Sequence, residues 1–175
     1  MGEADVETTA PVVRLLDDSF LRFLPAPLRE PRRAWLAILI GFVLTITGSL
    51  ALSYLSQSAA PGLPTPEFPV KGWVALFALV VFAPFVETLI MAAAIEILLL
   101  ILPPRFAVIA SATGWGIAHS LAAAAWGLVI WWPFLIFSTL YVTWRGKGRA
   151  IAIAIVFAVH ALNNLGPALL LLRSA

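Results

Sequence analysis

Long apolar runs dominate this sequence, and they constrain its fold more than any other feature. The runs cover residues 35–55, 73–102, 106–144 and 150–172. About 20 apolar residues are enough for a helix to cross a bilayer. The run 106–144 is about twice that length, so it must turn and supply two helices. The sequence therefore predicts an all-α, polytopic membrane bundle of about five transmembrane helices.

Proline and glycine suggest where the two longest runs bend. The run 73–102 exceeds one upright span, and Pro84 offers a position for a kink. Within the run 106–144, Trp126-Gly127 and Trp132-Pro133 are the candidate turns. We therefore expect a third helix up to about Ala125 and a fourth that follows it.

Composition excludes several other classes of protein. Hydrophobic residues make up 62% of the 175 residues and charged residues only 11%. A soluble domain of this size does not cover so much apolar surface with so few charges, so the lipid bilayer is the expected environment. Cysteine is absent, which excludes disulfides, thiolate nucleophiles and Cys-ligated zinc. Net charge is only +2, and we expect no nucleic-acid partner.

The basic residues predict the orientation of the bundle. With five alternating spans, nine of them fall on one side and only Lys71 and Arg173 fall on the other. Basic residues collect on the cytoplasmic side of membrane proteins. Residues 1–33 are therefore predicted to form a cytoplasmic N-terminal tail, and residues 34–172 a membrane-embedded domain. Within the tail, residues 19–28 fit either a segment on the membrane surface or an unstructured one.

Polar side chains inside the spans are the candidate functional residues, because burying such groups in hydrocarbon is costly. At ~1.5 Å per residue, four of them lie roughly 15–22 Å from the cytoplasmic ends of their helices. These four are Glu87, His119, His160 and Asn164. They are expected to meet in one pocket, although a single such residue can also be a packing or interhelical contact. Glu96 lies nearer the cytoplasmic end and is interpreted as a separate polar contact.

Several membrane chemistries lack the residues they need. There is no His-Glu-x-x-His motif of a zincin and no Asp inside any span for a two-aspartate protease. Ser111, Ser120 and Ser138 are not in a Gly-x-Ser-x-Gly setting. The remaining set of a carboxylate, two imidazoles and an amide suits hydrolysis by an activated water. The carboxylate would act as base, and His or Asn would stabilise the oxyanion.

Three segments resemble motifs of the CPBP family of intramembrane proteases, the CAAX-protease and bacteriocin-processing group. Residues 83–87 (Ala-Pro-Phe-Val-Glu) resemble the start of its Glu-Glu-x-x-x-Arg motif. Residues 115–119 (Trp-Gly-Ile-Ala-His) resemble its second motif, an aromatic residue four before a His. Residues 160–164 (His-Ala-Leu-Asn-Asn) resemble its His-x-x-x-Asn motif. The resemblance covers about residues 70–170.

This resemblance implies a role for each matching residue. Glu87 would be the base that activates water, and His119 would help to hold that water. His160 and Asn164 would bind water and stabilise the oxyanion. Family members often carry the metalloprotease label, so zinc is conceivable, but a glutamate mechanism without metal is favoured. The expected substrate is a membrane-associated peptide or protein, and the expected location is a bacterial inner membrane.

Two positions depart from the first motif, and they keep other functions open. Thr88 replaces the second Glu, and Ala92 replaces the Arg. One alternative is an inactive family member that acts as a membrane binding or immunity protein. Another is electron transfer, with His119 and His160 as axial ligands of a b-type haem.

Overall fold

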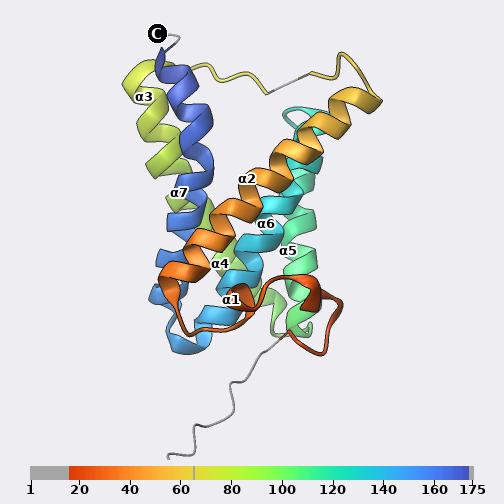
Figure 1. Ribbon diagram of the computed structural model, residues 1–175, viewed down its shortest axis with the longest axis vertical. Helices are drawn as coiled ribbons and strands as arrows, with labels where there is room; N and C mark the ends of the chain where they lie inside the picture. The colour runs from red at the N-terminus through yellow and green to blue at the C-terminus, as the bar shows by residue number, and fades with distance from the viewer. Residues whose placement is uncertain (1–15, 65, 174–175) are drawn as a thin grey trace, which may run out of the picture.

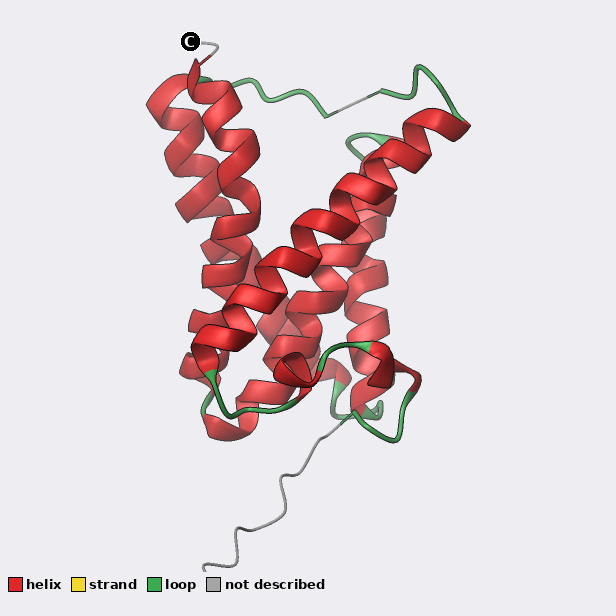
Figure 2. Cartoon of the chain, viewed as in Figure 1, coloured by secondary structure: helices red, strands yellow, loops and turns green. Residues whose placement is uncertain are grey.

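The protein is a bundle of long helices (Figures 1 and 2), known from a computed structural model that describes residues 16–64 and 66–173. The all-α prediction is confirmed, since the described residues contain no strand. The elements are η1 (Phe20–Phe23), α1 (Ala26–Arg29), α2 (Ala34–Ala59), α3 (Gly72–Phe77), the π-helical segment η2 (Ala78–Phe82), α4 (Ala83–Leu98), α5 (Pro104–Ser120), α6 (Ala124–Trp144), η3 (Arg145–Lys147) and α7 (Arg149–Arg173).

Among the described residues, the helical units α2, α3–η2–α4, α5, α6 and α7 follow one another along the bundle in alternating directions (Figure 1). Four helical units are long and apolar enough to cross a membrane: Ala34–Ala59, Gly72–Leu98, Ala124–Lys147 and Arg149–Arg173. The fifth, α5, has 17 residues and a length of roughly 26 Å. That is slightly short of the ~30 Å hydrocarbon core of a bilayer. The chain is therefore a membrane protein with four candidate spans and a shorter fifth helix that packs against α6 and α4.

Glu96 joins three segments at the end of the bundle where α1 lies. Tyr141 Oη and Arg145 Nε both donate to its Oε1 at 2.9 Å. The Nη2 atoms of Arg145 and Arg149 donate to its Oε2, also at 2.9 Å. A carboxylate that accepts a bidentate guanidinium and two further donors forms a strong, geometrically specific contact. Glu96 thus fastens α4 to α6 and α7, apart from the other polar residues, as the sequence predicted.

The described part of the N-terminal segment is folded against the bundle. Its leucines at positions 16, 21, 24 and 28 are almost completely buried, and α1 contacts both α2 and α6. Arg29 pairs with Asp17 and donates from Nε to the Leu24 carbonyl oxygen at 2.8 Å. Residues 16–33 are therefore docked onto the helices, which the sequence did not predict. The rest of the predicted tail, residues 1–15, lies outside the described residues.

The turn in the run 106–144 lies at residues 121–123, so both predicted turn positions were wrong. Trp126-Gly127 and Pro133 all lie inside α6. The reason for Gly127 is close packing, because a Cβ there would lie 2.1 Å from the carbonyl oxygen of Gly116 on α5. Small residues let two membrane helices approach in this way.

A second close contact fixes α2 across α6. The Trp132 indole donates from Nε1 to the carbonyl oxygen of Leu44 at 2.7 Å. Gly48 makes room for the ring, since a Cβ there would lie 2.0 Å from the indole nitrogen. This contact leaves α2 slanted across the bundle and separates its second half from α7 (Figure 1).

Candidate functional site

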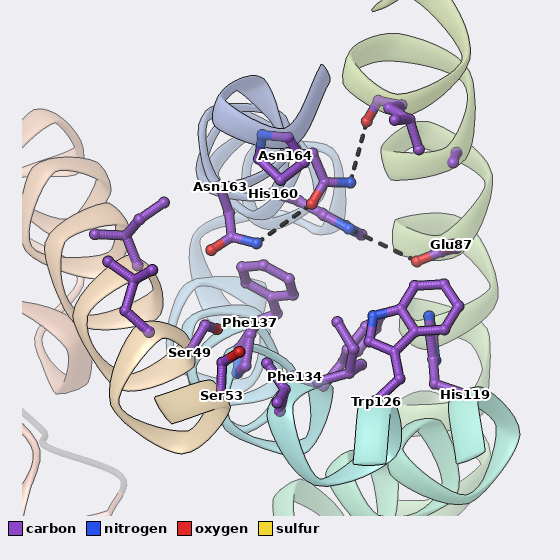
Figure 3. A pocket seen from close by; sticks show the side chains of 18 of the residues that line it. Ser49, Ser53, Glu87, His119, Trp126, Phe134, Phe137, His160, Asn163 and Asn164 are labelled. Atoms are coloured by element: carbon purple, nitrogen blue, oxygen red, sulfur yellow. Dashed lines mark hydrogen bonds and ion pairs between the residues drawn. The ribbon is translucent and has the colours of Figure 1, made fainter. Parts of the chain in front are cut away.

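One cavity of about 320 Å³ lies between α2, α4, α6 and α7 (Figure 3). It extends from the middle of the bundle toward the end opposite Glu96. Its walls are mainly apolar, and Glu87, His119, His160, Asn163 and Asn164 supply polar groups. The structure therefore brings all four candidate residues named from the sequence to one cavity, from three different helices, α4, α5 and α7.

Glu87 and His160 form an ionisable pair at this cavity. Glu87 Oε2 lies 3.6 Å from His160 Nε2, across the interface of α4 and α7. That separation is too long for a direct hydrogen bond, but it is a distance at which a water can bridge two polar groups. The Glu87 side chain is 26% exposed and that of His160 only 5%. The carboxylate therefore faces the cavity, while the imidazole is enclosed.

The ring of His119 is oriented by its own helix and by α6. Its Nδ1 lies 2.9 Å from the carbonyl oxygen of Trp115. Because a carbonyl oxygen only accepts, Nδ1 carries the hydrogen, and in the neutral ring Nε2 is left as an acceptor. The ring also makes an edge contact with Trp126, with 4.8 Å between the ring centroids.

Two phenylalanines of α6 hold the imidazoles in place. Phe134 contacts both rings, with centroids 5.8 Å from His119 and 5.6 Å from His160. Phe137 stacks on His160 at 4.6 Å. These apolar contacts restrict the orientation of both rings, and His160 is almost fully buried.

A hydrogen-bonded chain links α7 to the π-helical segment. Asn164 donates from Nδ2 to the carbonyl oxygen of Leu79 at 3.1 Å, and Asn163 donates from Nδ2 to Asn164 Oδ1 at 3.3 Å (Figure 3). Irregular helical turns leave backbone groups that need other partners. Leu79 lies in such a turn, immediately before the Ala83-Pro84 pair where the sequence predicted a kink. Asn164 thus satisfies a backbone acceptor and positions its amide at the cavity.

Thr88 and Ala92, the two departures from the family motif, do not reach the cavity. Both are buried, with 1% and 5% of their surfaces exposed. Thr88 Oγ1 has no hydrogen-bond partner among the described residues. These positions therefore serve packing between helices.

Sequence reasoning missed several residues that line the cavity. Ser49 and Ser53 line it from α2, and Trp126 lines it from α6. A pair of serines four residues apart in an apolar helix lies on one face, and that spacing is a signal that could have identified them. Trp126 was interpreted only as a possible turn residue.

No metal centre stands out in the part of the chain that the structure describes. Within residues 16–64 and 66–173, no three side chains of His, Cys, Asp or Glu are grouped so that they could hold one ion. Glu87 and His160 supply only two such ligands.

Comparison with known proteins yields no relative: no protein-family model, no curated protein and no solved structure matches the chain.

Proposed function

We propose that this protein is a membrane-embedded peptidase similar to the CPBP family. The observation that carries the proposal is the Glu87–His160 pair, at a separation that a water can bridge, in a cavity that His119 and Asn164 also line. The three-motif resemblance supports the same assignment, because the residues that carry its roles are the ones that meet. An open carboxylate beside fixed imidazoles is an arrangement that can activate water.

The proposed reaction is the addition of water to a peptide carbonyl. Glu87 accepts one proton from the water while the water oxygen bonds to the carbonyl carbon. His119 Nε2 helps to orient that water. One N–H of the Asn164 side-chain amide donates to the Leu79 carbonyl oxygen. The second N–H is therefore the one that stabilises the oxyanion. The C–N bond then breaks, and Glu87 returns its proton to the leaving nitrogen.

The first prediction concerns the base itself. Glu87→Gln keeps the size of the side chain but removes the proton acceptor, so peptide hydrolysis should fall by at least ~100-fold. The measurement is mass spectrometry of a pool of bilayer-spanning apolar peptides incubated with the protein in proteoliposomes. Glu67→Gln, which alters an exposed carboxylate before α3, is the matched control and should cleave normally. Unchanged cleavage by the Glu87→Gln variant would refute the assignment.

A second candidate is a binding protein without hydrolytic activity. The observation that favours it is that Thr88 and Ala92 stand where the family motif has its second Glu and its Arg, and both are buried away from the cavity. Glu87 therefore lacks those two partners. A wild-type protein that binds peptides from the pool but cleaves none of them would support this candidate over the first.

A further inference from the structure

Three polar atoms of cavity-lining residues are shielded from solvent and lack a hydrogen-bond partner among the described residues. One is His160 Nδ1, and the other two belong to Ser49 and Asn163. Ser49 Oγ on α2 and Asn163 Oδ1 on α7 are both buried and lack a hydrogen-bond partner among the described residues. Both side chains line the same cavity, from opposite walls (Figure 3). Buried polar atoms without partners are costly, so an unpaired set of them at a cavity indicates a ligand that pairs them.

The direction of each unpaired group follows from its neighbours. The Leu79 carbonyl oxygen can only accept, so Asn164 presents its NH₂ there and its Oδ1 to Asn163. Asn163 must then donate, which leaves its own Oδ1 as the free end of the chain. This oxygen needs a donor from outside the network.

Ser49 offers the complementary group. Many serines in membrane helices bond to the carbonyl oxygen one turn earlier, and Ser56 makes a similar local contact, to the Ser53 carbonyl oxygen at 2.9 Å. No such bond is formed by Ser49, so its hydroxyl hydrogen is available to a ligand acceptor.

A free acceptor on α7 and a free donor on α2 match the two polar groups of a peptide backbone. We infer that Ser49 and Asn163 bind the substrate main chain: Asn163 Oδ1 accepts from a backbone N–H, and the Ser49 hydroxyl donates to a backbone carbonyl oxygen. The ligand class is an extended apolar peptide segment that lies between α2 and α7, with its side chains against the apolar walls. This inference rests on the proposed function, because it names how the substrate of that same site is held.

Backbone recognition of this kind also makes chemical sense in a membrane. An extended segment in hydrocarbon has unpaired N–H and C=O groups, and leaving these groups unpaired is costly. A cavity that pairs them would favour unwound segments over intact helices, whose backbone groups are already bonded to one another.

The test measures binding separately from cleavage. The Glu87→Gln protein, reconstituted in nanodiscs, is titrated with fluorescent, acetylated and amidated apolar peptides, and the tightest binder is then remade with single backbone amides replaced by esters. One ester, which lacks the N–H donor, should weaken binding roughly fivefold, the effect of one net hydrogen bond. In the Glu87→Gln protein that also carries Asn163→Leu, the all-amide peptide should bind more weakly by a similar factor. That double variant should bind the all-amide peptide and the affected ester analogue equally well.

Ser49→Ala should weaken binding by a comparable factor, whereas Ser56→Ala, seven residues further along the same helix, should not. Equal binding of every ester analogue and its parent would overturn the inference, and this comparison needs no variant at position 163. The absence of peptide binding would overturn it as well. Binding that depends on Ser49 and Asn163 without any wild-type cleavage would support the inference and refute the peptidase. Cleavage that requires Glu87 but neither Ser49 nor Asn163 would support the peptidase and refute the inference.

Discussion

Asn164 connects two parts of the molecule that the sequence places far apart. Its amide on α7 pairs the Leu79 carbonyl oxygen in the π-helical segment, 85 residues earlier. Without the Asn164 donor, the Leu79 carbonyl oxygen would be unpaired at a depth where little water is available to take the place of that donor. Asn164 therefore has a structural role besides the one proposed in catalysis, and the two can be separated by measurement.

Removal of that amide should destabilise the fold. We expect Asn164→Leu to lower the free energy of unfolding by about 1–3 kcal/mol, the cost of a buried acceptor left without its donor. Asn163→Leu should have a smaller effect, since the bond between Asn164 and Leu79 remains. Unfolding of the purified proteins in mixed micelles gives both values. Equal stability of the Asn164→Leu variant and the wild type would show that the π-helical carbonyl does not depend on α7.

At the scale of elements, the contact between α5 and α6 positions one wall of the cavity. Gly127 lies against Gly116, and the same crossing brings Trp126 against the ring of His119. The geometry of the site thus depends on a helix approach that leaves no room for even one methyl group.

Gly127→Ala should therefore disturb both stability and activity. The added Cβ would lie 1.9 Å from Ser120 Oγ and 2.1 Å from the Gly116 carbonyl oxygen, so the helices must separate. We expect a loss of about 1–3 kcal/mol in unfolding free energy, together with weaker hydrolysis. Gly114→Ala on α5 is the control, because a Cβ there meets nothing within 4 Å, and its effect should stay within about 0.5 kcal/mol. A Gly127→Ala protein as stable as this control would contradict the close-packing argument.

The helices were predictable from the sequence, but their contacts were only partly so. Apolar runs and the depth of Glu87, His119 and His160 follow from counting along the chain, and these residues do line one cavity. The turn after Ser120 was not found, because its residues are as apolar as the helices it joins. Gly127 suggested a turn, yet it serves a tertiary contact, which a single sequence does not encode locally. The same limit applies to Ser49, whose importance depends on what α7 places opposite it.

The whole molecule has two chemically different ends. One end is where α4 ends, α5 begins and the segment 16–33 is docked (Figure 1), and it carries Arg105 and Glu96 with its two arginines. The cavity extends from the middle of the bundle toward the other end. If the basic end is cytoplasmic, substrates must reach the cavity from the membrane itself or from the far side. Orientation would thus determine which proteins the proposed peptidase could reach.

That orientation can be measured directly, because the chain has no cysteine. Single cysteines at Gly146, in η3 at the basic end, and at Ser58, near the opposite end of α2, are both at exposed positions. A membrane-impermeant maleimide added to intact cells should label Ser58→Cys, and should label Gly146→Cys only after the membrane is permeabilised. The cysteine-free protein is the control for background labelling. Labelling of Gly146→Cys alone in intact cells would reverse the bundle and place the mouth of the cavity toward the cytoplasm. Labelling of both would mean that the number of crossings between them is even, which would exclude α5 as a span.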